Sequence, residues 1–305
     1  MATRSNRVLL TGSRGFTGRH LRAVLESGGE RVLGLINEGE PSEGEYVADL
    51  TDADALARAL EQARPDFVVH LGGIAFVAHD EPAGMYATNA IGSLNLLEAL
   101  ARLDKPPQRV VLASTANVYG AAGDEPLDES TPAFPRSHYA ASKLAMEAIA
   151  SVYADRLPCT ITRPFNYTGP GQAPHFLVPK IVEHFARRAP RIELGNLDVE
   201  RDFLDVRTVA SIYATLLRCG QPSEAVVNLC SGRTHSLREI VSLLQDITGH
   251  EIEVVTNPAF VRDNDIRRLV GCNARLRSLL GTAPAMDMEA TLRDMLEAAT
   301  GHQRA

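Results

Sequence analysis

Short apolar runs alternate with longer stretches in which apolar residues recur at helical spacing along the first half of the chain. The short runs predict five strands, which lie at Val8 to Thr11, Arg31 to Ile36, Phe67 to Leu71, Val110 to Ala113 and Cys159 to Thr162. The helical spacing predicts helices between them, at residues 16 to 25, 54 to 63, 85 to 103 and 138 to 156. Because neighbouring parallel strands need a crossover, and crossovers are usually helices, this strict alternation predicts an α/β fold with a doubly wound, mostly parallel sheet.

The pattern changes after Pro164. Helices are expected at residues 176 to 187, 209 to 218 and 237 to 248, mixed with short strands near Ile192, Val226 and Ile252. We therefore divide the chain into a first domain, residues 1 to 165, and a smaller mixed α/β lobe, residues 166 to 305, which we expect to be interleaved with the first domain and to return one strand to its sheet.

The composition is that of an ordinary folded protein. Of 305 residues, 45% are hydrophobic and 23% are charged, which separates the chain from disordered sequences. A net charge of -7 argues against binding to nucleic acid. The four cysteines lie far apart and no metal-site spacing is present, so we expect reduced cysteines, no metal and a cytoplasmic location. No apolar run approaches the roughly 18 residues that span a bilayer, so we expect no membrane contact.

Three glycines fill the turn between the first strand and the first helix. Gly12, Gly15 and Gly18 stand at Gly-x-x-Gly-x-x-Gly spacing. Glycine lets the backbone take positive φ and approach a pyrophosphate closely, while the helix N-terminus offers N–H groups to an anion. The turn therefore predicts a dinucleotide-binding loop of Rossmann type, although the spacing alone also fits a turn used for packing.

The end of the second strand bears on which dinucleotide is bound. An acidic residue there usually holds the ribose 2′-hydroxyl of NAD. In this chain Asn37 follows the strand, with Glu38 one place later. Arg14 lies inside the glycine loop, where a guanidinium can pair with a 2′-phosphate. We therefore favour NADP(H) over NAD(H); the alternative is that Arg14 is a solvated loop charge.

A tyrosine and a lysine form the strongest candidate for chemistry. Tyr139 and Lys143 are four positions apart in a predicted helix, so they share one face. An ammonium beside a phenol lowers the tyrosine pKa from about 10 and lets the phenol exchange a proton with a carbonyl or alcohol oxygen near neutral pH. Ser114 and Thr115 directly follow the fourth strand, at the sheet edge where open α/β folds bind ligands, and a hydroxyl there can hold the reacting oxygen.

With these motifs the chain resembles the extended short-chain dehydrogenase/reductase family along nearly its whole length. The motifs occur in the expected order: Thr11-Gly12-x-x-Gly15-Phe16-x-Gly18, Asp49-Leu50, His70-Leu71-Gly72-Gly73, Ser114-Thr115-x-x-Val118-Tyr119-Gly120 and Tyr139-x-x-x-Lys143. The resemblance implies catalysis by Thr115, Tyr139 and Lys143. It also implies a set of cofactor-binding residues, namely Gly12, Arg14, Gly15, Phe16, Thr17, Asn37, Asp49, Leu50, Leu71, Gly72, Gly73, Ala113, Tyr139, Lys143 and Pro164.

The second lobe is similar to the substrate lobe of family members that act on nucleotide sugars. Asn166 looks like the asparagine that they bring to the sugar diphosphate. The stretch from Leu194 to Phe203 is similar to one in GDP-mannose 4,6-dehydratases and GDP-6-deoxy-4-keto-mannose reductases, and Arg201 and Arg262 would then bind the diphosphate. Each arginine could instead pair with a nearby aspartate. The resemblance implies a GDP-linked sugar as substrate, bound by Asn117, Asn166, Val178, Lys180, Asn196, Arg201 and Arg262.

The residues after Thr115 distinguish between reactions of the family. Its dehydratases use carboxylates there as the acid and base of an elimination, whereas this chain has Ala116 and Asn117. We therefore expect a reductase that acts on a GDP-linked 4-keto-6-deoxy sugar, with NAD(P)H giving hydride and Tyr139 giving the proton. A nucleotide-sugar 4-epimerase or 4,6-dehydratase with tightly bound NAD(P) is the alternative.

A different class of protein is also compatible with the fold. A catalytically silent, dinucleotide-sensing protein would bind the cofactor, but it would have no need of the Tyr139 and Lys143 pair. Family members commonly dimerise through two long helices of each chain, so the resemblance also implies a homodimer with a four-helix interface built from residues 85 to 103 and 138 to 156.

Overall fold

The computed structural model describes residues 5–75, 81–121, 123–219, 225–260 and 266–302. Contacts between Cα atoms divide the chain into two compact units. The first unit comprises residues 1–120, 129–164 and 210–228, and the second comprises residues 121–128, 165–209 and 229–305. Each unit draws on several separate stretches of the chain. The boundary after residue 165 stays a prediction.

The first unit is built on a seven-stranded sheet with the order β10-β6-β5-β4-β1-β2-β3. The strands are β1 (Arg7–Thr11), β2 (Arg31–Ile36), β3 (Glu45–Val47), β4 (Phe67–His70), β5 (Arg109–Ala113), β6 (Cys159–Pro164) and β10 (Ala225–Leu229). The pairs of β1 with β2 and β4, of β2 with β3, of β4 with β5 and of β5 with β6 are all parallel. This confirms the doubly wound α/β fold, and β10 is the strand that returns to the sheet late in the sequence.

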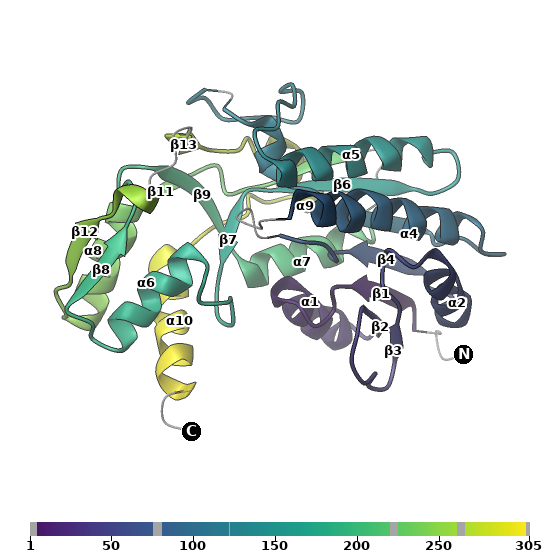
Figure 1. Cartoon of the computed structure of the whole chain (residues 1–305), viewed down its shortest axis with the longest axis horizontal. Coiled ribbons are helices and arrows are strands. Elements are labelled where there is room, and N and C mark those ends of the chain that lie inside the picture. Colours follow the sequence, from purple (N-terminus) through teal and green to yellow (C-terminus); the bar gives the residue numbers. More distant parts are fainter. Residues whose placement is uncertain (1–4, 76–80, 122, 220–224, 261–265, 303–305) are drawn as a thin grey trace. The chain divides into compact units, whose positions relative to one another are not determined.

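Helices cover both faces of this sheet (Figure 1). They are α1 (Phe16–Ser27), α2 (Ala53–Ala63), α3 (Pro82–Tyr86), α4 (Gly92–Ala101), α5 (His138–Val152) and α7 (Val206–Leu216). Apolar side chains of α2, α4 and α5 pack with those of the strands into one buried core, whose members include Leu60, Leu97 and Met146 beside Val68 and Val110. Burial of such side chains contributes about 25 cal/mol per Å² of apolar surface and favours the layered arrangement.

Three sequence predictions need correction in this unit. The alternation of strands and helices is not strict, because the unpredicted short strand β3 follows β2 without an intervening helix. The helix expected at residues 85 to 103 is divided into α3, a π-helical turn at Ala87–Ile91, and α4. The helix α5 ends at Val152, before the expected end at residue 156.

The second unit has two smaller sheets. In one, β9 (Glu200–Asp205) pairs with β7 (Asn166–Thr168), β11 (Thr234–Ser236) and β13 (Arg268–Leu269). In the other, β8 (Arg191–Leu194) pairs in parallel with β12 (Glu253–Thr256). The helices α6 (Leu177–Ala186), α8 (Leu237–Thr248) and α10 (Met288–His302) enclose an apolar core, and the shorter α9 (Ala274–Leu280) completes the unit.

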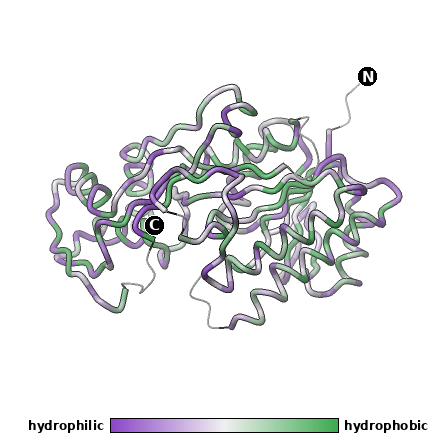
Figure 2. Tube along the Cα trace, turned by 90° about the horizontal axis from the view of Figure 1, so that it is seen from above, coloured by the Kyte–Doolittle hydropathy of each residue, from purple (hydrophilic) through white to green (hydrophobic). Residues whose placement is uncertain are grey.

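Hydrophobic and hydrophilic residues alternate along the helices, as the colours of Figure 2 show. This is the pattern of helices that bury one face and expose the other. Among the described residues, no helix is long and apolar enough to span a membrane. Short 3-10 or π-helical segments and tight turns join several of the elements. One of these segments, the 3-10 helix Ala116–Tyr119, follows β5 at the carboxyl edge of the sheet.

Candidate active site

The glycine loop joins β1 to α1 with a geometry that needs glycine. Gly12 has φ +67, and its carbonyl oxygen accepts a hydrogen bond of 3.0 Å from Gly15 N. A Cβ atom on Gly12 would lie 3.0 Å from Gly72 N, and one on Gly18 would overlap the carbonyl oxygen of Gly12. The first turn of α1 carries no acidic side chain. The loop thus leaves the positive end of α1 open to an anion, as the pyrophosphate of a dinucleotide requires.

A buried hydrogen-bond chain ties this loop to the neighbouring strand and helix. Gly72 N donates to Thr11 Oγ1 at 2.8 Å, and Thr11 Oγ1 lies 2.7 Å from His70 Nδ1. The other ring nitrogen, His70 Nε2, lies 2.9 Å from Ser93 Oγ, which donates to the carbonyl oxygen of Asn89 at 2.6 Å. Because the Ser93 proton is already used, Ser93 Oγ must accept from Nε2, and Nδ1 must accept from Thr11. These hydrogen bonds therefore fix His70 as the neutral Nε2–H tautomer.

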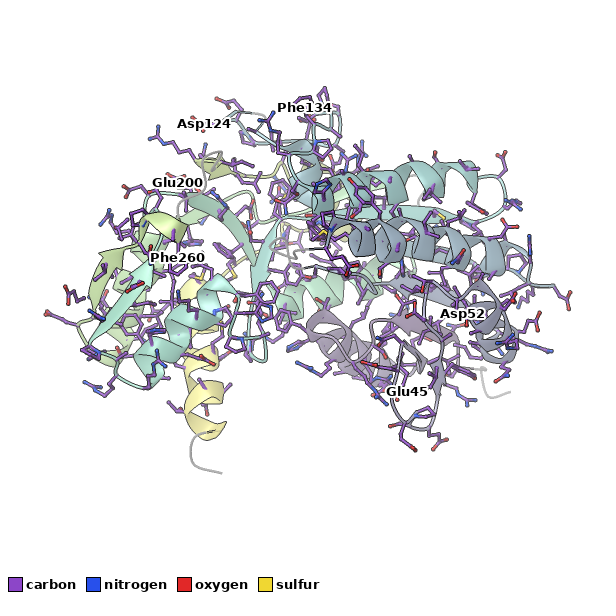
Figure 3. All side chains as sticks on the ribbon, viewed as in Figure 1. Glu45, Asp52, Asp124, Phe134, Glu200 and Phe260 are labelled. Carbon is purple, nitrogen blue, oxygen red and sulfur yellow. The ribbon has the colours of Figure 1, made fainter. Side chains whose placement is uncertain are left out.

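The residues expected around the adenosine ribose lie at the ends of β2 and β3. Asn37 is exposed just after β2. Arg14 reaches from the loop to this end of the sheet, where its Nη2 atom donates to Glu45 Oε2 and to the carbonyl oxygen of Glu40, both at 2.6 Å. Glu45 is labelled in Figure 3. Hydrogen bonds from Thr51 hold the pKa of the exposed Asp49 below its usual value.

The other expected cofactor residues line the same edge of the sheet. Leu71, Gly72 and Gly73 directly follow β4. Leu50 is buried, Thr17 is buried in the first turn of α1 next to the partly exposed Phe16, and Pro164 ends β6. In the first unit the structure thus brings the predicted cofactor residues to the carboxyl ends of the parallel strands, where open α/β sheets bind ligands.

The predicted catalytic residues meet at the end of β5. Lys143 is buried on α5, and its Nζ atom donates to the carbonyl oxygen of Ala113 at 2.9 Å. Tyr139 is buried one helical turn earlier on α5. Thr115 follows β5 and caps the 3-10 helix, with Oγ1 accepting from Asn117 N at 3.2 Å. Because this oxygen acts as an acceptor in that bond, the hydroxyl proton of Thr115 is still available for donation. The 3-10 helix packs against α5.

Burial tunes the ionisable groups around this point. Desolvation lowers the pKa of Lys143 to about 8, against the opposing effect of Glu147 one turn later on α5. Desolvation also lowers the pKa of His70 to about 3, and the nearby ammonium of Lys143 adds to this effect. Lys143 is therefore largely charged at neutral pH, while His70 is neutral, as its hydrogen bonds require.

Sequence reasoning missed a buried ion pair next to the predicted catalytic residues. Glu147 and Arg163 are both buried, and Arg163 Nη2 lies 2.6 Å from Glu147 Oε2. The signal that could have found Glu147 is its spacing: Tyr139, Lys143 and Glu147 repeat every four residues and so share one face of α5.

The predicted substrate residues divide between the two units. Asn117 belongs to the first unit, in the 3-10 helix. In the second unit, Asn166 begins β7 and its amide contacts the carbonyl oxygen of Asp202 at 3.4 Å, while Val178 is buried on α6. Arg201 lies on β9, where Nη1 donates to the carbonyl oxygen of Glu200 at 2.9 Å. Arg262 lies outside the described residues.

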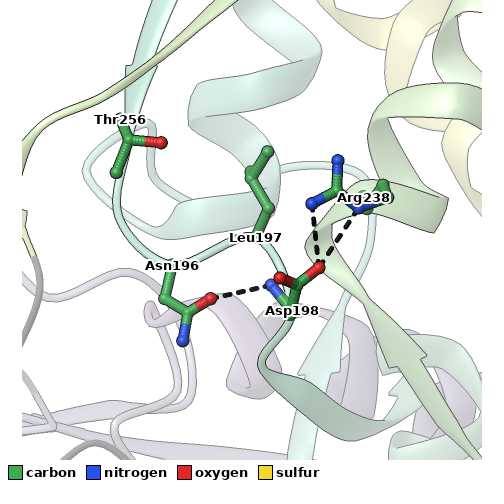
Figure 4. A pocket seen from close by; sticks show the side chains of 5 residues that line it. All are labelled: Asn196, Leu197, Asp198, Arg238 and Thr256. Carbon is green, nitrogen blue, oxygen red and sulfur yellow. Dashed lines mark hydrogen bonds and ion pairs between the residues drawn. The ribbon is translucent and has the colours of Figure 1, made fainter.

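Two further substrate candidates, Lys180 and Asn196, lie near the end of β8. Lys180 Nζ donates to the carbonyl oxygen of Glu193 at 3.0 Å and lies 4.5 Å from the ring centre of Phe260. The side chain of Asn196 accepts from Asp198 N at 2.9 Å. Asn196 also lines an open pocket of about 270 Å³ together with Leu197, Asp198, Arg238 and Thr256 (Figure 4).

The carboxylates suggested as alternative partners of Arg201 are bound by other groups. Asp202 is fully buried and accepts hydrogen bonds from Ser231, Gly232 and Gly271. Asp205 pairs with Arg207, whose Nη2 atom lies 2.6 Å from Asp205 Oδ2. These contacts anchor β9 within the second unit. No group of three or more potential metal ligands occurs within the described ranges.

A doubly wound sheet with a glycine turn at its first strand, and with a Tyr-x-x-x-Lys helix beside its fourth long strand, defines a dinucleotide-dependent enzyme of the short-chain dehydrogenase/reductase class. Residues 9–295 match the family described as GDP-mannose 4,6 dehydratase. The chain belongs to this family.

Individual relatives agree with this assignment. The chain is 37% identical over 276 residues to a GDP-6-deoxy-D-talose 4-dehydrogenase of Aggregatibacter actinomycetemcomitans, covering 90% of this chain and 91% of the relative. It is 36% identical over 303 residues to the GDP-6-deoxy-D-mannose reductase of Pseudomonas aeruginosa, covering 96% of each. Among solved structures, RMD from Pseudomonas aeruginosa complexed with NADPH superposes with a TM-score of 0.86 at 34% identity, covering 98% of each chain.

Proposed function

We propose that this enzyme reduces the 4-keto group of a nucleotide-linked 4-keto-6-deoxy sugar with NAD(P)H, and that the natural substrate is GDP-6-deoxy-4-keto-D-mannose. The observation that carries the proposal is the buried stripe of Tyr139 and Lys143 on α5, with Lys143 bound to the end of β5 at Ala113. Such a stripe supplies a proton to a carbonyl oxygen beside a dinucleotide loop.

The burial of Tyr139 and Lys143 and the hydrogen bonds of Lys143 and Thr115 support the following roles. The nicotinamide, when bound, supplies hydride to C4 of the sugar. Tyr139 donates its phenolic proton to the oxygen on C4, so the carbonyl becomes an alcohol, and solvent then restores the proton. The ammonium of Lys143 stabilises the phenolate that remains. Thr115 donates a hydrogen bond to the same oxygen and holds the carbonyl in position.

The positions after Thr115 favour reduction over dehydration. Ala116 is buried and has no proton to exchange, and Asn117 carries an amide, which does not act as an acid or a base near neutral pH. Elimination of the hydroxyl on C6 needs both functions, whereas reduction at C4 needs neither.

The proposed cofactor is NADP(H). The guanidinium of Arg14 donates to the carbonyl oxygen of Glu40, in the segment that follows β2, and to the carboxylate of Glu45. The end of β2 offers the amide of Asn37 in place of a carboxylate. A guanidinium there can bind the 2′-phosphate. The relative from Pseudomonas aeruginosa that was solved with NADPH supports this choice.

The proposed nucleotide is GDP. The relatives from Aggregatibacter actinomycetemcomitans and Pseudomonas aeruginosa both carry GDP-linked sugars in their names. In the second unit, Asn166, Lys180 and Arg201 supply amide and cationic groups, which suit a diphosphate. The sugars of the two relatives, 6-deoxymannose and 6-deoxytalose, differ in configuration at C4, so identification of the product also assigns the face that receives the hydride.

The test is turnover of GDP-6-deoxy-4-keto-D-mannose by the full chain with NADPH or NADH, followed by the ultraviolet absorbance of the reduced cofactor. We expect one NADPH consumed per sugar and slower turnover with NADH. If an isomerised sugar appeared and no NAD(P)H were consumed, the enzyme would instead be an epimerase. An NADH preference would refute the cofactor assignment alone.

The variant Tyr139→Phe tests the proton donor. We expect kcat to fall about 100-fold or more, because general acid catalysis of this kind contributes about 10²–10⁴-fold. The dissociation constant for NADPH should change little, since the ring remains. Tyr153→Phe is the matched control, because it removes a hydroxyl that donates to Glu98 at 2.7 Å just beyond the end of α5, and it should keep full activity. A dinucleotide-sensing protein would show no turnover in any form.

We also propose that the enzyme forms a homodimer through α4 and α5. Two large apolar residues are exposed here: Ile91, in the π-helical turn that leads into α4, and Val152, at the end of α5. Both α4 and the π-helical turn pack against α5. Apolar side chains on such faces favour association.

A further inference from the structure

Glu147 lies at the centre of a buried polar cluster in the first unit. The cluster consists of Ser114, Glu147, Arg163, Tyr119 and Asn228, all with exposed fractions below 9%. Arg163 donates to both oxygens of Glu147, from Nε at 3.0 Å and from Nη2 at 2.6 Å. The Ser114 hydroxyl donates to Glu147 Oε1 as well. Both carboxylate oxygens are therefore bound, and the orientation of the side chain is fixed.

The rest of the cluster holds Arg163. Its guanidinium lies 4.8 Å from the ring centre of Tyr119, and Tyr119 Oη donates to Asn228 Oδ1 at 2.7 Å. Burial, the largest single effect, lowers the pKa of Arg163, but the hydrogen bonds and charges of Glu147 and Tyr119 together outweigh it and raise the pKa. The ion pair is thus retained in a place where charges are costly.

Two consecutive residues of the β5 end are attached to the same face of α5. Ala113 accepts from Lys143, and Ser114 donates to Glu147, which lies one helical turn further along α5. The next residue along the chain is Thr115. Tyr139 lies one turn before Lys143 on this face. The attachment of Ser114 therefore determines where Thr115 stands along the helix that carries Tyr139.

We propose that Glu147, held by Arg163, is a positioning residue that binds Ser114 and thereby fixes Thr115 against the face of α5 that carries Tyr139 and Lys143. This role rests on the proposed function, because Thr115 and Tyr139 act on the same carbonyl oxygen there. Glu147 acts through Ser114 and itself touches neither substrate nor cofactor.

Ser114→Ala removes the attachment with the least disturbance. Thr160→Val is a matched control, because Thr160 is also buried, its hydroxyl also binds a charged side chain, Arg109, and it lies in the adjoining strand β6. We expect Ser114→Ala to lower kcat about tenfold, with KM and NADPH affinity changed less than twofold. The reason is that a misplaced Thr115 hydroxyl slows the chemical step without weakening the binding of substrate or cofactor. Thr160→Val should keep kcat within twofold. Equal kcat in the two variants would reduce Ser114 to a structural role and overturn the proposal.

A double-mutant cycle tests the route through Glu147. The variant Glu147→Met/Arg163→Met removes both charges together, so no unpaired charge is left buried. We expect it to fold and to lose as much kcat as Ser114→Ala. Adding Ser114→Ala to it should cause no further loss, because the attachment is already absent. A full additional tenfold loss would show that Ser114 acts independently of Glu147.

Hydrogen exchange provides a measurement that needs no substrate. Ser114 N donates to the carbonyl oxygen of Thr162 at 2.8 Å, and Asn117 N donates to Thr115 Oγ1. In Ser114→Ala we expect the amides of residues 114 to 118 to exchange faster than in the wild-type protein, and in Thr160→Val to exchange at the wild-type rate. Unchanged exchange in Ser114→Ala would refute the positioning role. Absence of wild-type turnover with every nucleotide sugar would refute the proposed function, while the exchange result still decides this inference.

Discussion

At the scale of single residues, the structure around the glycine loop depends on the protonation state of the buried His70. His70 has no exposed surface, and its two ring nitrogens have opposite hydrogen-bonding roles, toward Thr11 and Ser93. A proton added to Nδ1 would have no acceptor, and it would place a second positive charge near Lys143. The neutral ring is therefore part of the folded structure that supports the glycine loop.

This arrangement predicts a loss of stability in mild acid. The folded pKa of His70 is about 3, against an ordinary value of 6.5, so between these values the unfolded chain binds the extra proton, and the free energy of unfolding falls as pH falls. From pH 7 to pH 5 the loss is about 2 kcal/mol. Urea unfolding at both pH values measures it. In His70→Asn the free energy of unfolding should differ between pH 7 and pH 5 by about 2 kcal/mol less than in the wild type. His20→Asn, a control on α1, should show the wild-type difference. A wild-type pH dependence in His70→Asn would contradict this prediction.

The placement of the candidate residues was predictable where it depends on local spacing. The glycine loop and the Tyr139 and Lys143 pair each lie within a few positions of the chain, so turn chemistry and helical periodicity were enough to find them. The contacts of Glu147 with Arg163 and Ser114 join three elements. A sequence does not show which buried charge will face which, because that depends on packing between elements.

At the scale of elements, the connection from β1 to α1 combines backbone conformation with close packing. Gly12 needs both a left-handed φ and space beside Gly72. Gly29, beyond the end of α1, also has a left-handed φ of +82, but a Cβ atom there would lie more than 4 Å from every heavy atom of the described residues outside its immediate chain neighbours. The two positions therefore separate backbone strain from steric exclusion.

Alanine at these two positions should give different results. Both changes impose a left-handed conformation on a residue with a side chain, which costs about 1–2 kcal/mol. We expect Gly12→Ala to weaken NADPH binding at least tenfold in addition, because its Cβ would press on Gly72, in the segment after β4 that we propose to adjoin the cofactor. Gly29→Ala should lower the melting temperature alone. Calorimetric titration with NADPH and thermal unfolding of both variants test this, and equal NADPH affinities would contradict it.

Elements with strong periodicity were predicted and those fixed by partners were not. The strands β1, β2, β4, β5 and β6 were found from their apolar runs, and α8 was found with its observed ends. The strand β3 has three residues, with none buried, so its pairing with β2 and not its own pattern makes it a strand. The π-helical turn interrupts apolar spacing that reads as one continuous helix.

At the scale of the whole molecule, the proposed dimer makes a prediction of its own. Val152 is 74% exposed at the end of α5, and burying such a side chain against a partner contributes about 1.5–3 kcal/mol. Val152→Asp should therefore shift the protein from dimer to monomer in light scattering coupled to gel filtration. Phe134→Asp, at an exposed position outside these helices that is labelled in Figure 3, is the control and should leave the mass unchanged. A dimeric Val152→Asp variant would refute this interface.

The late return of β10 has a consequence for synthesis on the ribosome. Its partner β6 ends at Pro164, yet β10 begins only at Ala225, after residues 165–209 of the second unit have been made. While that intervening chain emerges, β6 presents an unpaired row of backbone N–H and C=O groups, the kind of edge that invites pairing with other chains. The nascent protein consequently passes through an interval in which this edge of the sheet is open to pairing with other chains, before its native neighbour has been synthesised.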